Sequence, residues 1–243
     1  MRHVVWDWNG TLYDDLHIVV GAVNASLAEL GERPIDDEAY RDHYTRPVRR
    51  FYEALLDRPV SSDEFVMIDR VFHDTYGASL DQAGLAVDAE TAVSRVSAAS
   101  TQSLLSMWRH DSLVDYVGRL GLASYMTRID GNRSTADASK AGAMEEHVTM
   151  LIADGTITDR TPVLVIGDGL DDARSAAAAG VDCVLYAGGT HHRRELEGAG
   201  VPVADTLTIV TSWMSGRRNF NFEPGDSEVH RARMHVSYLT PIL

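Results

Sequence analysis

Four short apolar segments recur along the chain, each bounded by polar residues or glycine. They are HVVWDW at 3–8, TQSLLSMW at 101–108, PVLVIGD at 162–168 and DCVLYAG at 182–188. Continuous apolar runs of this length are typical of strands buried on both faces of a parallel sheet. Helical patterns separate the later segments, including LDDARSAAAAG, which ends at Gly180. This alternation predicts an α/β fold with right-handed crossovers.

The pattern between the first two segments differs, because apolar residues there recur at helical spacing. LHIVVGAVNASLAEL stops at Gly31, and Ser61 with Glu64 forms a capping-box pattern before a further helical stretch. We therefore expect a Rossmann-like, three-layer parallel-sheet core with an inserted helical cap. The predicted boundaries are 1–13 and 87–215 for the α/β core, 14–86 for the cap, and 216–243 for a C-terminal tail of mixed charge.

The stretch VVWDWNGTLYDD at 4–15 allows two interpretations. Asn9 and Gly10 between apolar residues favour a β-hairpin with a type I′ turn. The same residues place Asp7 at the end of a strand, ahead of a glycine turn and Thr11. That arrangement suits a carboxylate nucleophile. The local pattern leaves both interpretations open.

Composition narrows the range of partners. The chain has 243 residues, 44% of them hydrophobic and 24% charged, which is ordinary for a soluble enzyme. A formal net charge of −14 argues against nucleic acid or an anionic membrane as partner. The N-terminus lacks a signal-peptide pattern and no apolar run reaches a membrane-spanning length, so a cytoplasmic location is expected. The single cysteine, Cys183, excludes internal disulfides.

Chemistry-bearing residues follow the predicted strands, and parallel sheets bind ligands beyond the carboxyl ends of their strands. These residues are Asp7, Ser106 in LLSMW, and Asp168, Asp171 and Asp172 in VIGDGLDD, with Lys140 before the third strand. Each alone has an ordinary explanation, such as a turn, a helix cap or a solvated lysine. Together they suit phosphoryl transfer, because carboxylates hold Mg²⁺ and a lysine neutralises a phosphate.

Specific roles follow from that chemistry. We expect Asp7 to attack phosphorus and form an aspartyl-phosphate, and Asp168, with Asp172 behind it, to help hold Mg²⁺. The hydroxyl of Ser106 and the backbone N–H groups of the turn at Asn9 and Gly10 are expected to bind phosphoryl oxygens.

These motifs resemble those of the haloacid dehalogenase superfamily of Mg²⁺-dependent phosphohydrolases, in its phosphoglycolate-phosphatase-like branch with a helical cap. The resemblance runs over about residues 1–213 and rests on DWNGT at 7–11, Ser106, Lys140, GDGLDD at 167–172 and the stretch up to ADTL. It implies that Asp7 is the nucleophile. It also implies Mg²⁺ contacts from Asp7, the backbone carbonyl of Asn9, and Asp168 with Asp172 in support. Thr11, Ser106 and Lys140 would then bind the phosphoryl group.

Asn9 departs from the family pattern, in which a second aspartate protonates the leaving oxygen and later activates water. An amide can do neither, and losing an acid–base group costs about 10²- to 10⁴-fold in rate. Three alternatives remain open. The protein is a phosphatase restricted to good leaving groups or helped by an acid such as Asp14 or Asp15; it is an impaired phosphate-binding or regulatory protein; or it is a dehalogenase, which the retained GDGLDD motif disfavours.

Substrate selection is expected in the cap, which would close over the site. The cluster TRPVRR provides Arg46, Arg49 and Arg50, and we take Arg49 as a candidate substrate contact. The pair His191 and His192 is expected at the surface. The predicted substrate is a small phosphorylated metabolite, and the sequence leaves open whether the protein is a monomer or a homodimer.

Overall fold

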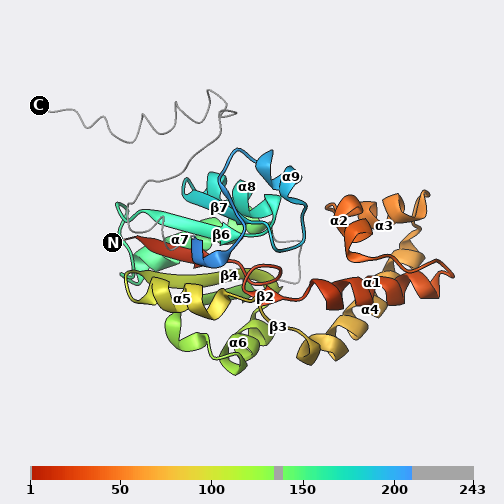
Figure 1. Cartoon of the computed structure of the whole chain (residues 1–243), viewed down its shortest axis with the longest axis horizontal. Coiled ribbons are helices and arrows are strands. Elements are labelled where there is room, and N and C mark those ends of the chain that lie inside the picture. The colour runs from red at the N-terminus through yellow and green to blue at the C-terminus, as the bar shows by residue number, and fades with distance from the viewer. Residues whose placement is uncertain (1, 134–138, 210–243) are drawn as a thin grey trace, which may run out of the picture.

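A parallel sheet forms the centre of the molecule. The computed structural model describes residues 2–133 and 139–209. Within these residues a six-stranded sheet has the order β5-β4-β1-β6-β7-β8, with every neighbouring pair parallel. The strands are β1 (His3–Trp6), β4 (Thr101–Arg109), β5 (Ile129–Asn132), β6 (Val163–Gly167), β7 (Asp182–Tyr186) and β8 (Val203–Ala204). The four apolar segments of the sequence correspond to β1, β4, β6 and β7, which are the central strands (Figure 1).

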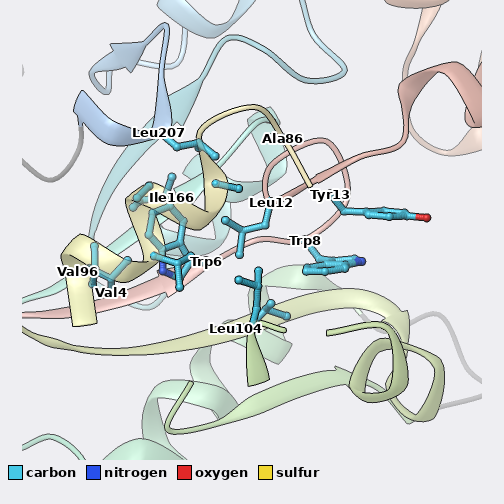
Figure 2. Close-up of a cluster of buried hydrophobic side chains, with 14 of the residues drawn as sticks. Val4, Trp6, Trp8, Leu12, Tyr13, Ala86, Val96, Leu104, Ile166 and Leu207 are labelled. Atoms are coloured by element: carbon cyan, nitrogen blue, oxygen red, sulfur yellow. The ribbon is translucent and has the colours of Figure 1, made fainter. Parts of the chain in front are cut away.

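Helices cover both faces of this sheet and complete three layers. They are α5 (Ala89–Ser97), α6 (His110–Arg119), α7 (Lys140–Ala153), α8 (Leu170–Ala178) and α9 (Arg193–Glu197), with a 3₁₀ turn at Ala123–Tyr125. Alternate residues of β1 point to opposite faces: Trp6 packs with Leu104 and Ile166, as Figure 2 shows, whereas Val5 packs with Val165 on the other face. The predicted α/β class is confirmed.

A helical lobe, called the cap below, lies between β1 and β4 in the chain. It contains α1 (Leu16–Glu29), α2 (Asp37–His43), α3 (Val48–Leu56), α4 (Ser62–Ser79) and a 3₁₀ turn at Leu80–Gln82. The chain enters through β2 (Tyr13–Asp14) and returns through β3 (Gly84–Leu85), which pair antiparallel at the junction with the sheet (Figure 1). The lobe has a core of its own, built around Leu27, Phe51 and Ile68. The predicted tail at 216–243 lies outside the described residues.

The turn after β1 is not the type I′ hairpin that its sequence favours. Type I′ needs a positive φ at both central residues, but only Gly10 has one, at +71°. Thr11 N and Tyr13 N both donate to Trp8 O, at 3.1 and 2.9 Å, so the chain closes into a tight loop. The rings of Trp8 and Tyr13 stack 5.3 Å apart inside the protein and hold this loop in place (Figure 2).

No helix in the described part of the chain is long and apolar enough to cross a membrane.

Candidate active site

Three buried carboxylates meet at the carboxyl-terminal edge of the sheet. Asp7 follows β1, Asp168 follows β6, and Asp172 lies in the first turn of α8. The strands β1 and β6 are parallel neighbours with Trp6 opposite Ile166, so their ends reach the same edge. One ligand oxygen from each carboxylate lies within 4.8 Å of the others. The structure therefore brings together the three acids expected to hold a metal.

Lys140 is the cation of this cluster. It is the first residue of α7, a helix capped by Ser139, whose hydroxyl accepts from Gly142 N. Lys140 Nζ lies 2.9 Å from Asp7 Oδ1 and 2.6 Å from Asp172 Oδ1. Burial alone would lower the pKa of Lys140, but the two carboxylates raise it, so the ammonium group stays charged. A phosphate next to Asp7 would meet this charge.

The cluster holds more negative charge than Lys140 offsets. Burial and the charge of Asp172 raise the pKa of Asp7 well above its usual range, although Lys140 opposes this shift. Burial likewise raises the pKa of Asp172. A divalent cation would relieve this repulsion, and Mg²⁺ prefers carboxylate oxygens. The donor set formed by Asp7, Asp168 and Asp172 therefore fits Mg²⁺.

The orientation of Asp168 is fixed by two hydroxyl groups. Its Oδ2 accepts from Thr190 N at 2.7 Å and from Thr190 Oγ1 at 2.6 Å, and its Oδ1 accepts from Thr11 Oγ1 at 3.2 Å. A Cβ at Gly10 or Gly189 would collide with this carboxylate, which explains glycine at both positions. Thr11 therefore contacts Asp168, one of the carboxylates expected to hold a metal. The sequence reasoning missed Thr190, although the GGT stretch after the predicted strand at 182–188 was a usable signal.

Ser106 reaches the site from a different position in its strand than expected. The strand β4 continues to Arg109, so Ser106 does not end it, and the pairing with β5 shifts register after Leu105. This irregularity still leaves Ser106 at the carboxyl-terminal edge. Its hydroxyl accepts from Trp108 N at 3.1 Å and donates to Asn9 Oδ1 at 3.4 Å. The prediction that Ser106 lies near Asn9 and Asp7 is consistent with this contact.

The N–H group of Gly10 is used within the turn. It lies 2.9 Å from both Asp15 Oδ1 and Tyr13 O. Thr11 N is likewise bonded to Trp8 O. In this structure the Gly10 N–H therefore bonds within the turn, and the binding of phosphoryl oxygens by this turn, Lys140 and Ser106 stays a prediction.

Asn9 joins the turn to the cap. Its Nδ2 donates to Asp15 Oδ2 at 2.8 Å and to Tyr76 Oη at 2.9 Å. Tyr76 lies on α4 of the cap, and its hydroxyl donates to Asp15 Oδ2 at 2.8 Å. Asp15 is 1% exposed and accepts from Asn9, Tyr76 and the Gly10 N–H. The sequence reasoning named Asp15 only as a substitute acid and gave Tyr76 no role.

The cap touches the core through residues other than the predicted arginine. The guanidinium of Arg49 lies 4.9 Å from the centre of the Phe65 ring, so it packs within the cap. Arg41 Nε instead donates to Gly189 O at 3.2 Å, next to the residues that hold Asp168. Arg46 Nε lies 3.4 Å from Asp171 Oδ2 on α8.

The two neighbouring histidines lie at the same junction rather than at the open surface. The rings of His191 and Tyr44 meet edge to face, 5.5 Å apart. His192 Nε2 lies 3.0 Å from Asp42 Oδ1 on α2, and both histidines are half-buried. The predicted surface location is wrong because the cap packs against this segment. The polarity of the segment gives no sign of that contact.

Comparisons with known proteins agree with this fold. Residues 138–210 match the family model described as HAD-hydrolase-like, a span that includes Lys140, Asp168 and Asp172. No curated protein matches the chain. A haloacid dehalogenase-like family protein from Streptococcus pneumoniae superposes with a TM-score of 0.74 at 17% identity, covering 88% of this chain and 98% of that one.

Further solved structures have the same architecture. A putative phosphoglycolate phosphatase from Lactobacillus delbrueckii subsp. bulgaricus gives a TM-score of 0.74 at 16% identity, covering 88% of this chain and 98% of that one. A putative β-phosphoglucomutase from Thermotoga maritima gives 0.63 at 14% identity, covering 89% and 100%. The molecule is an α/β protein with the haloacid dehalogenase-like fold. Over residues 138–210 the family model confirms the resemblance to that superfamily's hydrolases seen first in the sequence motifs, and the solved structures confirm the fold.

Proposed function

We propose that this protein is a Mg²⁺-dependent phosphatase that acts on a small phosphorylated metabolite through Asp7. The observation that carries the proposal is the buried cluster of Asp7, Asp168 and Asp172, with Lys140 Nζ between two of the carboxylates. A structural salt bridge would need one acid for one lysine. Three buried acids with one lysine leave a charge that calls for a cation.

The reaction begins with Asp7. Its carboxylate oxygen attacks phosphorus in line with the departing oxygen and forms an aspartyl-phosphate. Lys140, held charged by its neighbours, offsets the negative charge of the phosphoryl group, and the Ser106 hydroxyl would turn from Asn9 Oδ1 to donate to a phosphoryl oxygen. When bound, Mg²⁺ supplies charge neutralisation and polarises the phosphoryl oxygens. Thr11 and Thr190 keep Asp168 aimed at the cluster.

A second candidate function is phosphate binding without turnover, and the amide at position 9 is the observation that favours it. Asn9 cannot donate or remove a proton during the reaction. The nucleophile and the groups that would bind phosphate do not depend on that proton transfer. The two candidates therefore differ in turnover and not in ligand.

Hydrolysis assays separate the two. Wild type is incubated with Mg²⁺ and a panel of phosphomonoesters and acyl phosphates, beside Asp7→Asn and Asp14→Asn. Asp14 is a matched control because it is an exposed aspartate on β2. We expect Asp7→Asn to lower kcat/KM by about 10⁴-fold or more and Asp14→Asn to retain activity. Wild-type rates equal to those of Asp7→Asn on every substrate would leave only the binding function.

A further inference from the structure

The amide of Asn9 is locked in one orientation. An asparagine Nδ2 carries two protons, and here one is directed to Asp15 Oδ2 and the other to Tyr76 Oη. Asp15 supplies an acceptor oxygen, so the nitrogen and not the oxygen of the amide faces it. Oδ1 of Asn9 is consequently turned toward the Ser106 hydroxyl, at 3.4 Å. The group that Asn9 presents on the Ser106 side is a hydrogen-bond acceptor with no proton to give.

The nearby acids do not replace the missing aspartate. Both oxygens of Asp15 are occupied, Oδ1 by Gly10 N and Oδ2 by Asn9 and Tyr76, and the residue is 1% exposed. The Tyr76 hydroxyl donates its only proton to Asp15. Asp14 is exposed on β2 and pairs there with Gly84. The substitute acids considered from the sequence are therefore either enclosed or directed to solvent.

The surroundings of position 9 favour an amide. A carboxylate there would place an oxygen near Asp15 Oδ2, where Asn9 Nδ2 now lies at 2.8 Å, and the two negative charges would repel each other. The amide instead donates to that oxygen and to Tyr76 on the cap. Asp15 and Tyr76 are thus positioning residues for Asn9, and the contact spans the core and the cap.

We propose that this locked amide restricts the site to phosphorylated substrates whose leaving group departs as a stable anion, with acyl phosphates as the preferred class over alkyl phosphates. The inference rests on the proposed function. In the first step, an Asp7 oxygen bonds to phosphorus while the bond from phosphorus to the leaving oxygen breaks. The electron pair stays on that oxygen. A carboxylate holds this charge unaided, because carboxylic acids have pKa values of about 4. An alkoxide requires a proton that Asn9 cannot supply.

The second step is affected in the same way. A water oxygen bonds to phosphorus, the bond to Asp7 breaks, and its electron pair restores the Asp7 carboxylate. One water proton must leave, and the product is hydrogen phosphate plus a proton taken up by solvent. Asn9 Oδ1 can accept a hydrogen bond from this water but cannot remove its proton. The aspartyl-phosphate should therefore persist long enough to be trapped.

Leaving-group dependence tests the inference. We would measure kcat/KM with Mg²⁺ for acetyl phosphate, glycerol phosphate and a series of aryl phosphates whose phenols span several pKa units. For wild type we expect a steep fall as leaving-group basicity rises, with a loss of about 10²-fold or more from acetyl phosphate to glycerol phosphate. Acid quench followed by intact-mass measurement should show the phosphorylated chain. A shallow dependence in wild type, or no trapped species with acetyl phosphate despite turnover, overturns the inference.

Two variants make the comparison sharper. The exchange variant Asn9→Asp/Asp15→Asn places a carboxyl group at position 9 with an amide opposite, so the contact is kept and the repulsion is avoided. In this variant the ratio of kcat/KM for acetyl phosphate to kcat/KM for glycerol phosphate should be about 10-fold to 100-fold smaller than in wild type.

The second variant, His191→Gln, removes the imidazole whose Nδ1 lies 3.1 Å from Thr190 Oγ1. We expect the wild-type dependence in this variant, and a steeper one would assign the proton to His191 and overturn the inference.

The failure of this inference can be told apart from failure of the proposed function. If wild type matches Asp7→Asn on acetyl phosphate as well as on the esters, the phosphatase proposal itself fails. If wild type exceeds Asp7→Asn but hydrolyses glycerol phosphate as well as acetyl phosphate, only the restriction imposed by Asn9 is wrong.

Discussion

The two sides of the candidate active site are built differently. On the core side, Asp7 and Asp168 follow neighbouring strands, and Asp168 is held by Thr11 and Thr190 in loops at the same sheet edge. On the cap side, the contacts run through single side chains, such as Tyr76 to Asp15 and Arg46 to Asp171. The core side is therefore fixed by the sheet, whereas the cap side depends on separate polar contacts between two lobes.

Each side of the site accounts for a different property. The clustered carboxylates, with the proposed nucleophile Asp7 among them, belong to the sheet edge, which a parallel α/β fold provides wherever strands end together. The cap adds the hydrogen bond that orients Asn9 and partly covers the two histidines. Changes on the core side should consequently have larger effects than changes on the cap side.

The largest expected effect is stabilisation by Mg²⁺. A ligand present at 100 times its Kd raises the free energy of unfolding by about 2.7 kcal/mol. We expect Mg²⁺ to raise the Tm of wild type, and Asp168→Asn to abolish that rise because it removes one of the clustered carboxylates. Thermal unfolding in the presence of Mg²⁺ and in the presence of EDTA measures this rise in Tm. The matched control is Asp171→Asn, three residues along, which pairs with arginines rather than with the cluster and should keep the shift.

The next effect concerns the buried start of β1, at the other end of the strand from Asp7. His3 Nδ1 and Nε2 lie 2.8 Å from the hydroxyls of Thr101 and Ser103. Burial, together with the nearby His147, lowers the pKa of His3 from 6.5 to about 4, although Asp154 opposes the shift. As the pH falls, His3 is therefore protonated in the unfolded chain before it is protonated in the folded chain. The stability that His3 contributes is therefore complete above pH 6.5 and is lost as the pH falls toward 4.

Unfolding in urea at pH 7 and pH 5 measures this loss. We expect the contribution of His3 to fall by about 2 kcal/mol between these two values. Because other groups also titrate, the relevant quantity is the difference between wild type and His3→Gln at each pH. That difference should change by about 2 kcal/mol. If this difference in the free energy of unfolding is the same at both pH values, the folded protein accepts a proton on His3 without losing stability. The start of β1 would then not be a rigid part of the core.

A smaller effect is expected where the two sides meet. Tyr76→Phe removes the hydroxyl that donates to Asp15 and accepts from Asn9, leaving buried polar groups with one partner fewer. We expect a loss of about 1–2 kcal/mol in the free energy of unfolding. The control is Tyr116→Phe, whose hydroxyl donates to the exposed Asp81 and should cost less than about 0.5 kcal/mol. Equal losses in the two variants would show that the junction with Asn9 is not a specific contact.

The contrast between the two sides also explains how much could be predicted from the sequence. Asp7 and Asp168 were predictable because apolar strands are visible as continuous segments and their polar ends share an edge. Lys140 and Asp172 lie at the starts of helices and were predictable from the motifs that contain them. The short edge strands β5 and β8 were not, since IDGN and VA lack an apolar run.

The cap contacts could not be predicted for a different physical reason. Tyr76 reaches Asn9 across 67 positions of sequence, and Arg41 reaches Gly189 across 148. Local periodicity places such residues on helices but does not say which face meets the core. Arg46 and Arg49 show this limit, because they are three residues apart, yet Arg46 lies against α8 and Arg49 lies over the Phe65 ring. Long-range side-chain contacts depend on how the lobes pack, which no local pattern contains.

The smallest expected effect belongs to the outer edge of the cap. Arg46 Nε lies 3.4 Å from Asp171 Oδ2, and the two side chains are 59% and 40% exposed, so solvent screens the pair. We expect Arg46→Gln to lower the free energy of unfolding by about 0.5 kcal/mol or less. Arg174→Gln is the matched control, because Arg174 pairs with the same Asp171 carboxylate from within α8. The two variants should agree within about 0.5 kcal/mol in urea unfolding. A loss above about 2 kcal/mol for Arg46→Gln alone would place the cap edge among the strongly held parts of the site, and the distinction between a rigid core side and a loosely fastened cap side would fail.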